Sequence, residues 1–197
     1  MDLDLLSREL LRALRGRRSQ TAFSRRLGYK SNVAYAWESG HRAPTAAEAL
    51  RAAARVGVDL AAAFRRFYRS DPAWLAEADP TTPSGVAAFL RDLKGETPVA
   101  RLTEQSGLSR FRVARALSGE AEPRLADFLR LVQAMSMRGL DLCVALVDPA
   151  ALPSFHALWE RMEAQRRLAS EQPYTQAVLR ALELAGEEVE VQCVSDS

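Results

Sequence analysis

A length of 197 residues, with 48% hydrophobic and 26% charged residues, predicts one or two globular domains with real cores. No apolar run is long enough to cross a membrane, and the acidic start of the chain does not fit a secretory signal. The two cysteines, Cys143 and Cys193, stand in no metal or redox spacing. We therefore expect a cytoplasmic protein with reduced thiols and no membrane partner.

The net charge of +2 is distributed unevenly along the chain. Residues 1–70 carry 14 Lys and Arg against 6 Asp and Glu, a net of +8, whereas residues 171–197 carry 1 against 6, a net of −5. A basic first domain followed by an acidic tail is typical of a nucleic-acid-binding head with further segments behind it.

The first domain is organised around residues 19–44, which follow a leucine-striped helix expected at 3–15. This segment predicts two short helices joined by a tight turn. Ser19 is suited to the N-cap of the first helix, and Gly28 to a turn residue with positive φ. The second helix is expected to run from about Ser31 to Trp37.

The outer side of this second helix is suited to the DNA major groove. Asn32 can pair with an adenine edge through two hydrogen bonds, and Ser31 can make one. Tyr35 or Ala36 can meet a thymine methyl group. The side chains that we expect on phosphates are Lys30, His41 and Arg42.

Characteristic residues mark the ends of the two helices. They are Ser19-Gln20 at the start of the first helix, Leu27-Gly28 at the turn, Trp37-Glu38-Ser39-Gly40 after the second helix, and Pro44 before the next one. With these residues, positions 3–68 resemble the lambda-repressor-like (XRE) helix-turn-helix family. The resemblance implies a five-helix domain in which Gln20 touches phosphate and braces the recognition helix. The alternative is a helical hairpin that binds no nucleic acid.

The pattern recurs 79 residues later without a gap. Of the 41 positions from 11 to 51, 11 are identical to their counterparts, including turn glycines and a proline. Composition alone would give roughly three or four identities. We therefore expect an all-α fold with two tandem five-helix domains and C-terminal helices. The expected parts are a first domain at 1–69, a linker at 70–83, a divergent second domain at 84–147, and a helical segment with an acidic tail at 148–197.

The second copy departs from the first at its reading surface. Val99 replaces Gln20, so the phosphate contact is lost. Glu120 and Glu122 follow the second recognition helix and would repel phosphates. The side chains that could still contact DNA there are Arg110, Phe111, Arg112 and Arg115. The alternative is that this copy packs against the first copy or a second subunit.

The later segments are expected to be helical. An apolar stripe containing Phe155, Trp159 and Met162 predicts a helix at 154–170, and a second helix is expected at 175–185. Residues 187–193 alternate like a short strand, although we expect a loose tail. Large apolar side chains are costly to leave in water, so these helices must cover the second domain or a partner chain.

We find no catalytic constellation, metal-ligand cluster or cofactor motif, and we expect no enzyme activity. The sequence favours a sequence-specific transcription regulator or repressor that binds double-stranded DNA as a homodimer. Its later segments would form the dimer or receive a protein or small-molecule effector. Tandem domains could also supply both half-sites from one chain, but the second copy is a poor substitute for the first. The competing hypothesis is a protein-interaction adaptor or antitoxin-like partner that uses its helix-turn-helix folds for docking.

Overall fold

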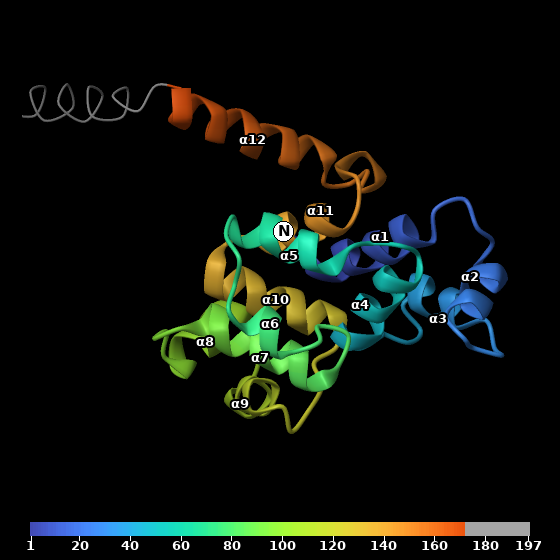
Figure 1. The fold of residues 1–197 in the computed structure, drawn as a ribbon, viewed down its shortest axis with the longest axis horizontal. Coiled ribbons are helices and arrows are strands. Elements are labelled where there is room, and N and C mark those ends of the chain that lie inside the picture. Colours follow the sequence, from blue (N-terminus) through green and yellow to red (C-terminus); the bar gives the residue numbers. More distant parts are fainter. Residues whose placement is uncertain (172–197) are drawn as a thin grey trace, which may run out of the picture. The chain divides into compact units, whose positions relative to one another are not determined.

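The computed structural model describes residues 1–171, which are all-helical, with no strand among them (Figure 1). This part of the chain divides into two units, the first spanning Met1–Phe155 and the second beginning at His156. The helix expected at 175–185 and the short strand or loose tail expected at 187–193 lie outside the described residues.

The first unit contains two runs of five helices. The first run is α1 (Leu3–Arg15), α2 (Gln20–Arg26), α3 (Val33–Ser39), α4 (Ala46–Arg55) and α5 (Leu60–Tyr68). The second run is α7 (Pro83–Lys94), α8 (Val99–Ser106), α9 (Arg110–Ser118), α10 (Leu125–Ser136) and α11 (Gly139–Leu146). Helices α8, α10 and α11 begin 79 residues after α2, α4 and α5, respectively. Helices α7 and α9 end 79 residues after α1 and α3. The predicted repeat is therefore present in the helix boundaries.

The repeat extends to the turns that end the short helices. Gly40 ends α3 and Gly119 ends α9, with φ angles of 81° and 82° in the left-handed region. A side chain would strain this conformation, which is why glycine stands at both places. The expectation that Gly107 and Gly119 flank a short helix is confirmed, because α9 lies between them.

The helices are amphipathic, and their apolar faces form the core. In α1, Leu6, Leu10 and Leu14 follow the helical period and are buried. The Asp2 carboxylate caps this helix by accepting hydrogen bonds from the backbone N–H groups of Asp4 and Leu5, each at 3.0 Å.

The two runs of helices share one core. The expected linker contains α6 (Trp74–Glu77), and the Trp74 side chain is only 6% exposed. Its ring centre lies 5.0 Å from that of Phe64 in the first run and 5.5 Å from that of Phe89 in the second. Phe89 also contacts Phe128, with ring centres 5.6 Å apart. Residues 70–83 therefore join the two runs through a common aromatic cluster rather than spacing them apart.

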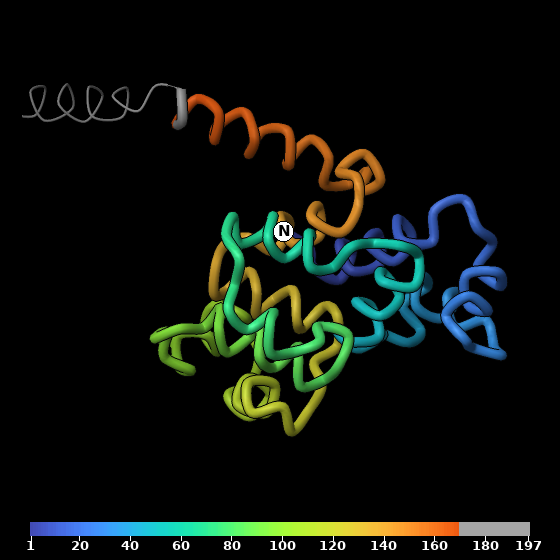
Figure 2. Tube along the Cα trace, viewed as in Figure 1, coloured from blue at the N-terminus to red at the C-terminus, as the bar shows by residue number. Residues whose placement is uncertain are grey.

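The chain trace brings α11 back alongside α5, the last helix of the first run (Figure 2). A 3₁₀ turn, η1 (Pro149–Ala151), follows, and the Ser154 N–H donates a hydrogen bond to a carboxylate oxygen of Glu9 at 3.2 Å. Phe155, one of the apolar residues expected on the next helix, is instead buried at the end of the first unit.

The described part of the second unit is the helix α12 (His156–Glu171), which begins two residues later than expected. Arg166 lies over the Trp159 ring, 5.6 Å from its centre, and forms an ion pair with Glu163 at 2.7 Å. These contacts lie along the helix itself and tie its charged and aromatic side chains together.

Candidate nucleic-acid interface

The two short helices expected at 19–44 are present as α2 and α3. Ser19 caps α2, because its hydroxyl accepts a hydrogen bond from the Ala22 N–H at 3.2 Å. The turn between the helices passes through Gly28, whose φ of 86° lies in the left-handed region. A Cβ atom there would also lie 2.9 Å from a guanidinium nitrogen of Arg55, which hydrogen-bonds the carbonyl of Leu27. The turn geometry therefore requires glycine, whereas the end of the Arg55 side chain could move to admit a Cβ atom.

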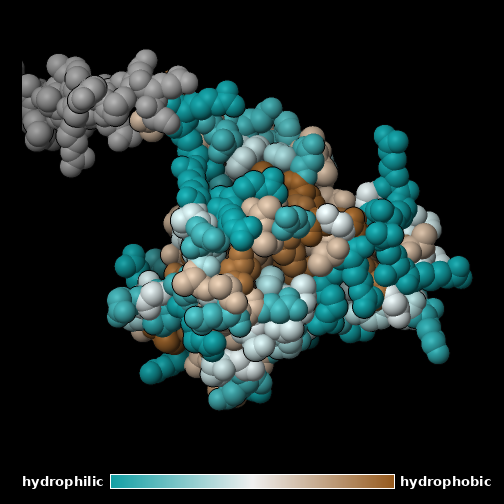
Figure 3. Space-filling view, in the orientation of Figure 1, coloured by the Kyte–Doolittle hydropathy of each residue, from teal (hydrophilic) through white to brown (hydrophobic). Residues whose placement is uncertain are grey.

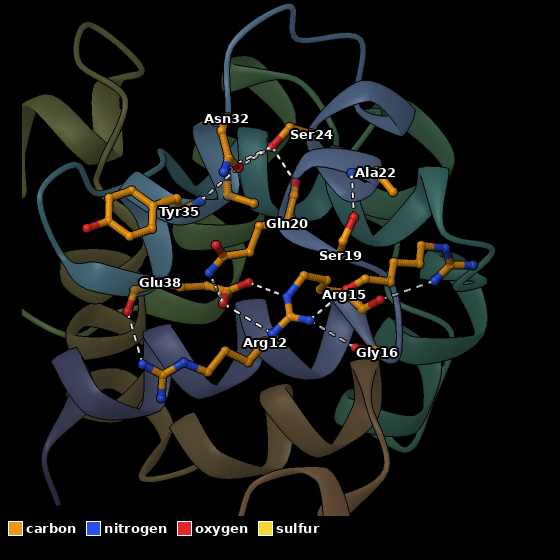
Figure 4. A network of polar contacts seen from close by, with 12 residues as sticks. Arg12, Arg15, Gly16, Ser19, Gln20, Ala22, Ser24, Asn32, Tyr35 and Glu38 are labelled. Carbon is orange, nitrogen blue, oxygen red and sulfur yellow. Dashed lines mark hydrogen bonds and ion pairs between the residues drawn. The ribbon is translucent and has the colours of Figure 1, made fainter.

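The second helix begins two residues later than expected, and Asn32 is its N-cap. The Asn32 Oδ1 accepts hydrogen bonds from the Tyr35 N–H and the Ser24 hydroxyl, both at 3.3 Å (Figure 4). This cap ends the extended segment that contains Ser31 and starts α3 at Val33. The amide oxygen is thus already engaged, which leaves the amide nitrogen as the group that Asn32 can offer to a base without breaking the cap.

A buried polar network fixes α3 against α1 and α2. The Glu38 side chain on α3 lies in the core, and the residue is only 5% exposed. Its carboxylate accepts hydrogen bonds from Arg15 at 2.6 and 3.2 Å and from the Gln20 amide at 2.9 Å (Figure 4). Arg12 adds a hydrogen bond to the Glu38 carbonyl at 3.0 Å. Gln20 therefore braces α3, which is one of the two roles that the family resemblance implied for it.

The outer side of α3 carries the remaining side chains expected to contact bases and phosphates. Tyr35 is 55% exposed, and its ring stacks on the His41 ring with their centres 6.0 Å apart. The Ser39 hydroxyl lies 2.6 Å from His41 Nδ1, which holds that ring in place. Ala36 is partly covered on the same helix. Tyr35 and His41 thus form one exposed aromatic surface at the end of α3.

Basic and polar side chains surround this surface. Lys30 and Ser31 are exposed in the turn before α3. Arg42 is exposed after it and pairs with Glu48 on α4 at 3.3 Å. Hydrophilic side chains, with others of intermediate hydropathy between them, cover the visible face over α2 and its turns (Figure 3). The structure therefore brings Lys30, Ser31, Asn32, Tyr35, Ala36, His41 and Arg42 onto one helix and its two flanking turns, whereas Gln20 lies on α2 with its amide on Glu38.

Glu48 also anchors the turn before α3. The Tyr29 hydroxyl donates a hydrogen bond to Glu48 Oε1 at 3.1 Å. Burial raises the pKa of Tyr29, and the neighbouring Glu48 carboxylate raises it further. The hydroxyl therefore stays protonated and keeps donating. The same carboxylate closes a capping box with Thr45 at the start of α4.

The second candidate surface lies on α9, which Ser109 caps. Arg110, Phe111 and Arg112 are exposed, and Phe111 is 68% exposed. The Arg115 guanidinium lies 5.2 Å from the centre of the Phe111 ring. Arg112 pairs with Asp127 at 3.6 Å, so part of this basic surface is already compensated within the chain.

The two surfaces share a backbone frame but not the buried network. Arg91 donates to the Leu117 carbonyl at 3.0 Å, as Arg12 does to the Glu38 carbonyl at the equivalent place. The counterparts of Arg15, Gln20 and Glu38 are Lys94, Val99 and Leu117. Apolar residues thus stand at two of the three positions of the buried charged network.

The two glutamates expected to repel phosphates both have partners within the chain. The Glu122 carboxylate accepts a hydrogen bond from the Thr45 hydroxyl at 2.8 Å, across the junction between the two runs of helices. Glu120 lies 3.8 Å from Arg115. The charge of Glu120 is therefore partly compensated by Arg115, whereas Glu122 keeps its negative charge, so the objection to DNA contact by α9 is weakened at Glu120 alone.

Comparison with protein-family models, with curated proteins and with solved structures found no match to this chain. Among residues 1–171, no group of His, Cys, Asp and Glu side chains is arranged to hold a metal ion. In the same residues, no helix is both long enough and apolar enough to pass through a membrane.

Sequence reasoning missed two features of this site. The capping role of Asn32 was detectable, since asparagine before an apolar helix is a strong N-cap signal. The Glu38 network was not, because its partners Arg15 and Gln20 stand 23 and 18 residues away, and only the packing of α1, α2 and α3 brings them together.

Proposed function

We propose that the protein is a sequence-specific DNA-binding transcription regulator of the cytoplasm, built from two tandem lambda-repressor-like helix-turn-helix domains. The observation that carries this proposal is α3, a short helix anchored by the buried Glu38 network and presenting exposed polar and aromatic side chains on its outer side. Specific recognition needs such a rigid reading element, because loosely held side chains lose entropy on binding.

The charge of the first run of helices supports the same proposal. Residues 1–70 have a net charge of +8, which attracts the phosphate backbone. Lys30 and Arg42 stand on either side of α3, where phosphate contacts would set its register in the groove. In this role Asn32 would donate its amide N–H to a base edge, and Tyr35 would contact a thymine methyl group.

The test is a gel-shift titration of genomic duplex fragments at several salt concentrations. We expect the logarithm of the binding constant to fall linearly with the logarithm of the salt concentration. Lys30→Ala and Arg42→Ala should each lower the magnitude of the slope by about 1. Arg161→Ala, which removes one exposed positive charge from α12, is the matched control and should leave the slope unchanged. Absence of binding at low salt would contradict the proposal.

One observation favours a protein partner as the second candidate. A cavity of about 290 Å³ beside α9 is lined by Leu108, Phe111, Ala116 and Leu131 among others. An adaptor or antitoxin-like protein would fill such a cavity with an apolar side chain of its partner. In that case Phe111→Ala would abolish partner binding, and the salt-dependent binding to DNA would be absent.

A further inference from the structure

The two runs of helices meet through a reciprocal pair of backbone hydrogen bonds. The Ala46 N–H donates to the Pro123 carbonyl at 2.9 Å, and the Leu125 N–H donates to the Pro44 carbonyl at 2.9 Å. Pro123 and Leu125 stand 79 positions after Pro44 and Ala46. Each bond is therefore the image of the other, as at a twofold symmetric interface.

A second contact joins equivalent residues at another point. The Arg66 side chain on α5 donates to the carbonyl of Ala145 on α11 at 2.7 Å, and these two positions are also 79 residues apart. A residue can meet its own counterpart only near a twofold axis. The bridge between Thr45 and Arg124 and the contact of Arg66 with Ala145 thus define a pseudo-twofold axis within one chain.

A rotation of about 180° around this axis brings α3 onto α9. Both helices end close to the bridge between Thr45 and Arg124. Each helix ends at a glycine that precedes the bridge residue by five positions, Gly40 before Thr45 and Gly119 before Arg124. The turns that follow are alike, because Arg42 N–H donates to the carbonyl four residues before Gly40 at 3.0 Å, and Ala121 N–H to its counterpart at 3.1 Å. In Figure 1, α3 lies to the right of α4, and α9 lies below α10.

Residues from both runs line a common polar cavity at this end. The cavity measures about 520 Å³ and is bordered by His41 and Arg42 after α3, and by Arg112, Arg124 and Arg130 from the second run. Four arginines therefore gather between the two helices. Asp127, Asp4 and Glu48 compensate part of their charge, because Asp127 pairs with Arg112 and Arg130, Asp4 with Arg130, and Glu48 with Arg42. The surface between the helices is thus suited to the phosphates that lie between two half-sites.

We infer that a single chain uses α3 and α9 as two reading helices and binds an asymmetric two-part site in duplex DNA without a second subunit. This inference rests on the proposed function. Helix-turn-helix proteins ordinarily obtain paired reading helices by dimerising, because DNA has its own local twofold symmetry. Here the pseudo-twofold axis supplies the pair within one chain, and the two half-sites would be centred about 10 base pairs apart.

The two half-sites must differ in sequence, because the two helices present different chemistry. Ser31 and Asn32 precede α3, and the Asn32 amide nitrogen can donate to N7 of an adenine while Tyr35 meets the methyl group of a thymine. Their counterparts are Arg110 and Phe111, and an arginine suits the two acceptors of a guanine edge. The site is therefore expected to combine an adenine-containing half with a guanine-containing half and to lack a palindrome.

The experiment uses the full chain and a duplex selected from a random pool. Native mass spectrometry gives the number of chains on the duplex, and base-by-base substitution of the duplex maps the preference of each variant. We expect one chain per duplex. Arg110→Ala should reduce the preference for guanine over the other bases about tenfold at one position, and only in the half-site that α9 reads. Asn32→Ser should lose discrimination in the other half, and Arg161→Ala, the charge control, should change neither.

Two chains on a palindromic duplex would overturn the inference and leave the proposed function standing. One chain on a duplex, with Arg110→Ala and Phe111→Ala both binding as the wild type does, would also overturn it by removing α9 from the interface. Circular dichroism shows whether each variant is folded. Selection of no duplex, even at low salt, would overturn the proposed function together with the inference.

Discussion

Arg66 donates a hydrogen bond to the carbonyl oxygen of Ala145 at 2.7 Å, and Ala145 is the residue that stands in the second run of helices where Arg66 stands in the first. A contact between counterparts means that the sequence repeat is also a symmetry of the packing. The two runs of helices pack against each other within one compact unit. They meet as two subunits of a dimer would, but with one covalent chain and one shared core.

The first prediction concerns the aromatic cluster at this junction. Trp74→Ala should lower the free energy of unfolding by about 3–5 kcal/mol, because it leaves a cavity between Phe64 and Phe89. Urea titration followed by circular dichroism should show one cooperative transition for the wild type and the variant. Leu75→Ala, at the next position of α6, is only partly buried and should cost much less. Two separate transitions in the wild type would contradict a shared core.

Local sequence signals predicted the helices of the first unit well. Leucine periodicity predicted α1, and the recurring glycines predicted the short helices and their repeat. Glycines are informative because they stand at turns with positive φ. The joining of the two runs was not predictable in this way. Asp-Pro and Pro-rich signals made residues 70–83 look like a spacer, whereas the Trp74 side chain is buried between aromatic rings of both runs. Long-range packing, unlike turn geometry, leaves no periodic mark in the sequence.

The candidate site was predicted unevenly for the same reason. The exposed residues around α3 were expected from helical spacing, and they lie on one helix and its turns. The start of α3 was placed two residues too early, near Ser31, because Asn32 was assigned to base contact and not to the cap. The roles of Glu38 and Glu122 depend on Arg15 and Thr45, which come from distant elements, so helical spacing could not reveal them.

The second prediction concerns the buried network. Glu38→Ala should lower the free energy of unfolding by about 2 kcal/mol, because Arg15 and Gln20 lose a charged acceptor in a covered position. The second run of helices suggests a control. A triple variant, Arg15→Lys with Gln20→Val and Glu38→Leu, copies Lys94, Val99 and Leu117, and it should be markedly more stable than Glu38→Ala. Urea titration measures both, and equal losses would show that the network is not what fixes α3.

The third prediction separates the two roles of Asn32. Asn32→Ala removes the cap of α3 and should cost about 1 kcal/mol of folding stability. Asn32→Ser keeps a capping oxygen and should fold nearly as the wild type does, while it loses the amide nitrogen that would donate to a base. Thermal unfolding and DNA titration should therefore rank the two variants differently. If Asn32→Ser retained full sequence preference, Asn32 would be a structural residue only.

The fourth prediction concerns alkaline pH. Complete burial raises the pKa of the Cys143 thiol well above its ordinary value of 9.0. The folded chain therefore keeps the thiol protonated after the unfolded chain has begun to ionise. The free energy of unfolding should fall as the pH rises above about 9, by up to about 1.4 kcal/mol per pH unit for this group.

Urea titrations at pH 7, 9 and 10 measure this loss. Cys143→Ala should make the alkaline decline shallower, although the variant starts from a lower stability because it removes a buried sulfur atom. Tyr68 also has a raised pKa through burial and its hydrogen bond to Asp92, so a smaller decline should remain at the highest pH. An unchanged slope in Cys143→Ala would show that the thiol is not protected as described.

Selection of duplexes from a random pool by the full chain, followed by sequencing, tests the central claim most directly. If one chain reads both half-sites, the selected motif should be non-palindromic, with two unlike halves centred about 10 base pairs apart, one preferring adenine and the other guanine. It also predicts that the enrichment weakens as the salt concentration rises. A pool that remains random after repeated rounds at low salt would contradict the account.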